Sequence, residues 1–350
     1  MKILVVRYRF IGDTILSVPF LRNLRKAYPD AQIDMLVGPV SGEVLQGCPY
    51  VDNFIVFDTT KKHRYEESGE NPRSFLSYVN LLRKNKYDKA YVLKRSFSSA
   101  ALVFLAGIKE RIGFDTENRG FFLTKPVPYY LDKHEIECFL DLLRADEIDI
   151  EDNHLEYWPD RDAKFKINSV IREKNPDNKP MAVVHATSGN PDKEWPYDNV
   201  AKVVEYLVNI KSVQVFHIGA SCDSEVYDRI RRYIQTDLEI EPVNLCGQLS
   251  IQENMALISK MNFVIGSDSG ILHMAAAVNT HVIGIYGPMN HEKWHVFGDQ
   301  HVVLYGDLPC IPCDLKIKCP YDIACLKEIT PMDVTCECNA FLFGLNNEEA

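Results

Sequence analysis

Residues 266–277 read GSDSGILHMAAA, and they follow the apolar run FVI at residues 263–265. The apolar run predicts a buried strand, SDSG predicts a turn, and ILHMAAA predicts a helix that starts at Ile271. A strand followed at once by a helix leaves free backbone N–H groups and the positive helix end at the carboxyl edge of a sheet. Diphosphates bind at such edges. The segment therefore predicts a parallel α/β sheet that carries an anion site.

The side chains of this turn have different expected roles. Gly270 lets a phosphate approach the backbone, Ser269 offers a hydroxyl donor, and His273 lies close enough to contact the same anion or a sugar hydroxyl. A bare carboxylate repels phosphate, so Asp268 is expected either to cap the helix or to accept hydrogen bonds from a sugar. An ordinary strand–turn–helix with no ligand is the alternative.

The same alternation of apolar runs and helical periods extends over all 350 residues. It predicts strands at residues 2–7, 32–38, 53–58 and 89–94, and again at 181–186, 213–219, 262–267 and 281–287. The charged, Pro-containing stretch between about residues 150 and 180 separates two Rossmann-like domains, expected at 1–158 and 159–328. A helix and tail at 329–350, introduced by Thr330 and Pro331, is expected to be able to pack back on the first domain.

Bulk properties exclude several classes of protein. The formal charge of −10 gives no basic excess for general nucleic-acid binding. No signal peptide and no apolar run of membrane-spanning length are found, so a cytoplasmic protein is expected, with peripheral contact at the inner face of the inner membrane left open.

Residues 11–21, IGDTILSVPFL, follow the first predicted strand and open a helix. Asp13 is expected to project beyond the sheet, where a carboxylate can act as a general base. The helix dipole favours its ionised form but weakens its basicity. A helix cap is the alternative role for Asp13.

Two further loops in the second half offer candidate ligand contacts. Lys193, in the loop of HATSGNPDKEWP at residues 185–196, can neutralise phosphate, or it can be a solvated surface charge. Glu225 starts the helix after the strand that ends at Gly219, and it can bind ribose hydroxyls or simply be a solvated or capping carboxylate.

Basic residues in the first half suggest contacts with phosphates or acidic sugars. Lys61, Lys62 and Arg64 follow the third predicted strand, while Lys94 and Arg95, with Lys109 and Arg111, surround the next unit. Solvated charge runs are the alternative.

Four cysteines near the C-terminus form a further cluster. Cys310, Cys313, Cys319 and Cys325 make a CxxC followed by two five-residue spacings, which is a sufficient ligand set for zinc or an iron–sulfur cluster but matches no common template. An adventitious cluster in a structured loop is the favoured interpretation, so no metal is expected.

Taken together, these segments resemble glycosyltransferase family 9, the ADP-heptose:lipopolysaccharide heptosyltransferase family. The resemblance rests on IGD after the first strand, KEWP, SDSGILHMAAA, the strand ending at Gly287 and Pro288, and a cysteine-containing segment that leads to ITPMDV. It covers nearly the whole chain.

The resemblance implies a GT-B architecture and an inverting, metal-independent transfer of heptose from ADP-heptose to a lipopolysaccharide-core or related glycan, with no cofactor. It implies that Asp13 is the catalytic base, and that the donor site comprises Lys193, Glu225, Asp268, Ser269, Gly270 and His273. With an acidic acceptor implied, the expected acceptor contacts are Lys61, Lys62, Arg64, Lys94 and Arg95. A sugar-nucleotide epimerase of the same fold, and an inactive nucleotide-sugar-binding protein, are the alternatives.

Overall fold

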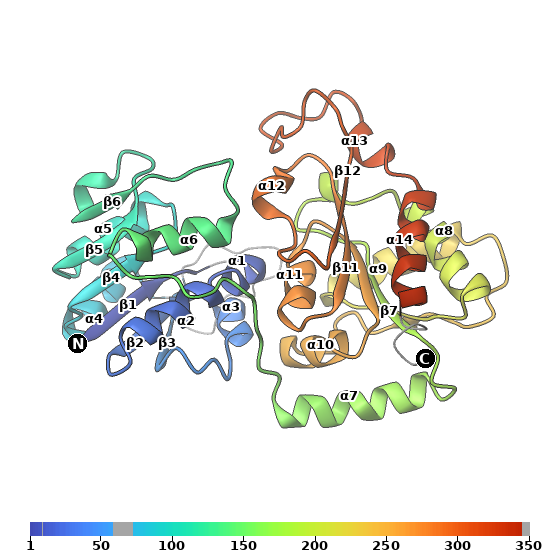
Figure 1. Cartoon of the computed structure of the whole chain (residues 1–350), viewed down its shortest axis with the longest axis horizontal. Coiled ribbons are helices and arrows are strands. Elements are labelled where there is room, and N and C mark those ends of the chain that lie inside the picture. The colour runs from blue at the N-terminus through green and yellow to red at the C-terminus, as the bar shows by residue number, and fades with distance from the viewer. Residues whose placement is uncertain (9, 59–72, 345–350) are drawn as a thin grey trace. The chain divides into compact units, whose positions relative to one another are not determined.

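The computed structural model describes residues 1–8, 10–58 and 73–344. Its internal contacts divide the chain into two compact units, Met1–Trp158 and Pro159–Ala350. The described residues of each unit form one six-stranded, all-parallel sheet with helices packed against it (Figure 1). The predicted α/β class with two Rossmann-like units is therefore confirmed.

The first sheet has the strand order β3-β2-β1-β4-β5-β6. Its core joins β1, β2 and β4 to helices α4 and α5 through residues such as Leu4, Val92 and Leu102. The elements of this unit are β1 Lys2–Val6, α1 Ile11–Ile15, α2 Val18–Ala27, β2 Gln32–Val37, α3 Pro39–Val44, β3 Asn53–Val56, α4 Phe75–Asn85, β4 Lys89–Val92, α5 Phe97–Leu105, β5 Glu110–Phe114, a 3-10 turn Gly120–Phe122, β6 Lys125–Val127 and α6 Glu135–Arg144.

The second sheet has the order β12-β11-β10-β7-β8-β9. Helices α8, α9 and α14 share one apolar core with β7, β10 and β11. The elements of this unit are α7 Arg161–Lys174, β7 Met181–His185, α8 Tyr197–Glu205 with a π turn Tyr206–Ile210, β8 Gln214–His217, α9 Ser224–Tyr233, β9 Val243–Asn244, α10 Ile251–Ile258, β10 Phe263–Ser267, α11 Gly270–Ala277, β11 His281–Tyr286, α12 His291–Trp294, β12 Val302–Tyr305, α13 Ala324–Lys327 and α14 Pro331–Gly344. Two short 3-10 turns, Pro191–Lys193 and Ser221–Asp223, precede α8 and α9.

All eight predicted strands form, and the described residues add four more strands to the sheets. Strands β5, β6, β9 and β12 lie toward the ends of the two sheets and are two to five residues long. Two of them, KPV and VN, are too short to produce a periodic pattern. ERIGF and VVLY are less buried than the central strands. Short strands at sheet edges are held by pairing with a neighbour, which local sequence does not encode.

The stretch between the two sheets is more ordered than its composition predicts. Residues expected to form a charged linker include α7, whose N-terminus is capped by Asp160 through a 2.6 Å hydrogen bond from the Ala163 N–H. Ala163 and Ile167 are the buried residues of this helix, and α7 packs on α10. These two residues, one turn apart, give the mostly polar helix a buried side that anchors it.

The C-terminal helix begins where Thr330 and Pro331 predict. Thr330 Oγ1 accepts the Asp333 N–H at 3.3 Å, and Pro331 is the first helical residue. Within the second unit this helix, α14, packs on α8 and β11. Among the described helices, none is long and apolar enough to cross a bilayer.

Candidate active site

Asp13 lies in the first turn of α1, directly beyond the carboxyl end of β1. The N-cap position of this helix is Phe10, whose φ of 58° turns the chain sharply between strand and helix. Asp13 is the third helical residue and does not occupy the cap position. The alternative role of Asp13 as a helix cap is therefore wrong.

The carboxylate of Asp13 is paired with the guanidinium of Arg7, which follows the last residue of β1. The side chains are only 12 % and 7 % exposed. Burial raises the pKa of Asp13 above its ordinary value of 3.8, while the charge of Arg7 acts to lower it. The result is a sequestered carboxylate that is more basic than one on the surface, yet has a cation beside it.

Other charges of the first unit reach the same carboxyl group. The positive charges of Lys94 and Arg95 lower the pKa of Asp13, and the negative charge of Glu135, at the start of α6, raises it. The Lys94 ammonium lies 4.9 Å from the Tyr8 ring centre, and the Arg95 guanidinium lies 4.2 Å from that of Tyr129. The structure thus brings two predicted acceptor contacts into the electrostatic neighbourhood of the predicted base.

Arg119 fixes the loop that carries these two cations. It is fully buried, and its guanidinium donates to the carbonyl oxygens of Phe114 at 2.8 Å and Lys94 at 2.9 Å. Sequence reasoning missed Arg119, because a single arginine in a loop gives no signal of burial. It also missed Arg7. A charged residue between an apolar strand and the IGD turn could have indicated a buried charge at this place.

The remaining basic residues divide into two groups. Lys61, Lys62 and Arg64 lie outside the described residues. Lys109 and Arg111 lie at the amino end of β5, whereas Lys94 and Arg95 follow the carboxyl end of the parallel strand β4. The expected grouping of all four is therefore wrong, because parallel strands place these pairs at opposite edges of the sheet.

In the second unit, the turn between β10 and α11 has the predicted form, with the helix beginning one residue earlier, at Gly270. Ser269 holds the N-cap position, so Asp268 is not the cap. The Asp268 carboxylate instead forms an ion pair with the Lys193 ammonium at 2.9 Å, and the side chains of Asp268 and Lys193 are 11 % and 18 % exposed. Ser188 Oγ also donates to the Asp268 carbonyl oxygen at 2.9 Å. Two loops 75 residues apart in sequence therefore meet at one helix start.

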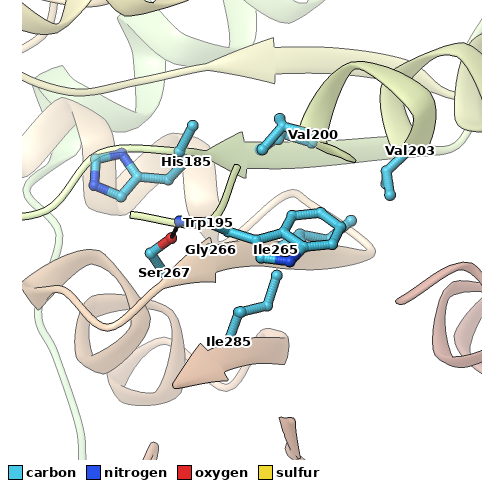
Figure 2. A pocket seen from close by; sticks show the side chains of 10 residues that line it. His185, Trp195, Val200, Val203, Ile265, Gly266, Ser267 and Ile285 are labelled. Atoms are coloured by element: carbon cyan, nitrogen blue, oxygen red, sulfur yellow. Dashed lines mark hydrogen bonds between the residues drawn. The ribbon is translucent and has the colours of Figure 1, made fainter. Parts of the chain in front are cut away.

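Trp195 holds the Lys193 loop against the sheet. Its backbone N–H donates to Ser267 Oγ at 3.0 Å, and its indole N–H donates to the Ile329 carbonyl oxygen at 3.0 Å. Figure 2 shows the indole beside Ile265 and Ile285, where these residues line a small internal hollow. Trp195 is only 2 % exposed, so it is a packing residue, and its packing fixes the position of the loop that carries Lys193.

Two buried polar atoms near this helix start have no protein partner. Among the described residues, neither Ser269 Oγ nor His273 Nδ1 makes a hydrogen bond. Burial lowers the pKa of His273 to about 4, so its ring is neutral near pH 7. Buried polar groups are normally hydrogen-bonded, so both atoms are available to a ligand at this helix start.

The other predicted site residues are less constrained. Glu225 is exposed in the first turn of α9. Cys310 is exposed, Cys313 and Cys319 are half-buried, and Cys325 is buried. Over the part of the chain that the structure describes, no three His, Cys, Asp or Glu residues are grouped so that they could hold a metal ion.

Comparison with known proteins gives consistent matches. The model of glycosyltransferase family 9 (heptosyltransferase) matches residues 76–323. Lipooligosaccharide heptosyltransferase 2 of Haemophilus influenzae is 27 % identical, over 87 % of this chain and 88 % of that protein. Lipopolysaccharide heptosyltransferase 2 of Escherichia coli K12 is also 27 % identical, over 83 % and 84 %.

Solved structures share the fold over almost the full length. A family 9 glycosyltransferase from Veillonella parvula superposes with a TM-score of 0.81 at 20 % identity, covering 98 % of this chain and 97 % of that one. The ADP-heptose lipopolysaccharide heptosyltransferase II of E. coli gives a TM-score of 0.78 at 24 % identity and full coverage of both chains. These neighbours have the GT-B arrangement of two parallel sheets with helices.

Proposed function

This chain belongs to glycosyltransferase family 9, the heptosyltransferase family, and we propose that it transfers heptose from ADP-heptose to a lipopolysaccharide inner-core or related glycan acceptor. The observation that carries the proposal is the Lys193–Asp268 pair at the start of α11, beside the unpartnered Ser269 Oγ and His273 Nδ1. It offers a diphosphate one cation, a helix N-terminus and two polar groups. Family membership supports transfer over the epimerase and the inactive binding protein.

Asp13 is the base in this proposal. Its carboxylate takes the proton of the acceptor hydroxyl as the oxygen attacks the anomeric carbon of the heptose. Attack from the face opposite the diphosphate forms the new C–O bond while the old one breaks, so the anomeric configuration inverts. The buried position of Asp13 raises its pKa, and a stronger base accepts the hydroxyl proton more readily.

The departing ADP leaves with the electron pair of the broken bond. Negative charge therefore grows on the diphosphate, and stabilising that charge is the main electrostatic task of the enzyme. Lys193 supplies a positive charge, and the N–H groups at the start of α11 supply hydrogen bonds and a positive dipole end. Lys193 must exchange part of its contact with Asp268 for the phosphate oxygens.

This exchange gives Asp268 a use in the loaded site. Once Lys193 turns to the diphosphate, the Asp268 carboxylate is free to accept hydrogen bonds from heptose hydroxyls. The proposal assigns Glu225 to the ribose hydroxyls on the strength of the family resemblance and of its position at the start of α9. Lys193 and the start of α11 together provide the positive charge that a divalent cation supplies in metal-dependent transferases. The proposed transfer is therefore metal-independent.

The acceptor side of the proposal uses Lys94 and Arg95, with Lys61, Lys62 and Arg64 as further candidates. Lys94 and Arg95 lie near Asp13, as contacts to an acidic inner-core sugar or its phosphate require. Because a lipopolysaccharide acceptor is anchored in lipid, the proposal places the enzyme in the cytoplasm, at the inner face of the inner membrane.

The direct test is transfer measured by mass spectrometry, with a deacylated core acceptor and a panel of ADP- and UDP-activated sugars. We expect product from ADP-heptose, undiminished by EDTA. Product from a UDP-sugar alone would contradict the donor assignment, and loss of activity with EDTA would contradict the metal-independent mechanism. A product that retains the donor's anomeric configuration would exclude the inverting mechanism.

A further inference from the structure

Helix α5 and the 3-10 turn Gly120–Phe122 expose an unusual group of large apolar side chains. Phe121 is 68 % exposed, Phe97 48 %, Phe104 44 % and Leu105 42 %. Phe122 joins the aromatic members, with ring centres 4.0 Å from Phe121, 5.0 Å from Phe97 and 5.2 Å from Phe104. We call Phe97, Phe104, Leu105 and Phe121 the α5 patch. Single exposed apolar residues are ordinary, but a contiguous patch marks an interaction surface.

Basic side chains border the α5 patch at its Leu105 end. Arg83 donates to the Leu105 carbonyl oxygen at 2.6 Å, the Arg111 guanidinium lies 5.3 Å from the Phe104 ring centre, and Lys109 is exposed four residues after Leu105. Of the nearby acids, Glu110 pairs with Lys89 at 3.2 Å, and Glu117 accepts the Phe97 N–H at the other end of the helix. The border near Leu105 is therefore positive, in a protein whose net charge is −10.

We propose that the α5 patch docks on the surface of an anionic lipid bilayer, with its phenylalanines in the interface and Arg83 and Lys109 on the lipid head groups. Aromatic and aliphatic side chains with a cationic border are the combination that binds membrane interfaces. Such a border attracts acidic lipids over about a Debye length, roughly 10 Å at 0.1 M salt. An acidic protein without this border would be repelled by the same surface.

The position of the α5 patch relates it to the acceptor. Phe97 is two residues from Arg95, and Lys94 and Arg95 are the proposed acceptor contacts whose charges act on Asp13. An acceptor whose sugars reach Asp13 while its acyl chains stay in the bilayer needs a lipid-facing surface beside the acceptor contacts. This inference rests on the proposed function for its biological sense, but vesicle binding can be measured without any transfer.

The test is co-sedimentation of the full chain with vesicles of phosphatidylethanolamine and phosphatidylglycerol, compared with vesicles of phosphatidylcholine alone. We expect binding to the anionic vesicles that weakens with added salt. The Phe104→Ser, Phe121→Ser double variant and, separately, Lys109→Glu should lower the bound fraction at least about threefold. The matched controls lie on α7, where Phe165 is 72 % exposed and Lys164 is also exposed. Phe165→Ser and, separately, Lys164→Glu should bind like the wild type.

Transfer to a deacylated, water-soluble acceptor separates this inference from the proposed function. The double variant should transfer to that acceptor at the wild-type rate and lose rate only with a vesicle-borne acceptor. If the wild type ignores anionic vesicles, or if the double variant binds them as the wild type does, the α5 patch is not a membrane surface. Failure of transfer by the wild type, with vesicle binding intact, would instead count against the proposed function.

Discussion

The guanidinium of Arg7 and the carboxylate of Asp13 form an ion pair inside the first unit, joining the end of β1 to the first turn of α1. Both side chains are almost fully removed from solvent, so each would be costly to bury alone. The pair keeps a charged carboxylate available in an environment that otherwise disfavours it.

Replacing Asp13 with Asn keeps the shape of the side chain and removes the proposed base. We expect the transfer rate to fall by about 10²- to 10⁴-fold, because this is the range over which a positioned base acts. Binding of ADP, measured by calorimetry, should be unchanged, since the proposed donor contacts all lie in the second unit. A variant that transfers at the normal rate would show that Asp13 is not the base.

Replacing Arg7 with Met should alter the pH dependence of transfer. The charge of Arg7 lowers the pKa of Asp13, so its loss raises that pKa further. Asp13 must be ionised to act, so activity is lost as pH falls through its pKa, and the acidic limb of kcat/KM should move to higher pH. Arg7→Lys should restore much of the original profile. A uniform loss of rate with an unmoved limb would mean that Arg7 serves only the fold.

Variants of Lys193 and Asp268 should differ in their effects on the binding of ADP and of intact ADP-heptose. Lys193→Met should weaken ADP binding by about tenfold or more, since a hydrogen bond to a charged group contributes roughly 1.5 to 3 kcal/mol. Asp268→Asn should affect ADP little and the intact ADP-heptose more, because the proposed Asp268 contact is to the sugar. Calorimetry with ADP and with a non-transferable ADP-heptose analogue measures both. If Asp268→Asn weakens the binding of both ligands equally, the proposed contact between Asp268 and the sugar is wrong.

Trp195 should be a determinant of stability. Trp195→Ala leaves a cavity between β10, β11 and α8 and removes the hydrogen bond to Ile329, so we expect a loss of about 3 to 5 kcal/mol in the free energy of unfolding by urea. Trp195→Phe keeps most of the volume and should cost less. If Trp195→Ala unfolds at the wild-type urea concentration, the packing role given to Trp195 is wrong.

The second unit should lose stability in mild acid. Burial lowers the pKa of His217 to about 4 from its usual 6.5, so the unfolded chain binds a proton that the folded chain does not. The stabilising contribution is complete above pH 6.5 and is lost as pH falls toward 4, at about 1.4 kcal/mol per pH unit. Urea unfolding at pH 7 and pH 5 measures this, and His217→Gln should flatten the dependence by that amount. An unchanged dependence in His217→Gln would assign the acid sensitivity to other groups.

Local sequence determined the buried central elements of each sheet. Apolar runs such as KILVV and FVIGS form central strands, because a strand covered on both faces must be apolar throughout. The placement of Asp13, Lys193 and Ser269 at strand ends followed from the same patterns, since parallel strands present their carboxyl ends at one edge. Edge strands such as β6 could not be predicted, because a three-residue strand has no periodic pattern of its own and is held by pairing with its neighbour β5.

Contacts between distant segments were decided only by the tertiary structure. GSDSG left Asp268 with two roles, a helix cap or a ligand contact, because both suit an acid at a helix start. The fold excludes the cap, because Ser269 holds the N-cap position, and it brings the Lys193 loop, 75 residues away in sequence, to within 2.9 Å of the Asp268 carboxylate. The burial of Arg7 beside Asp13 is likewise a property of packing, since desolvation depends on what surrounds a charge and not on the order of residues.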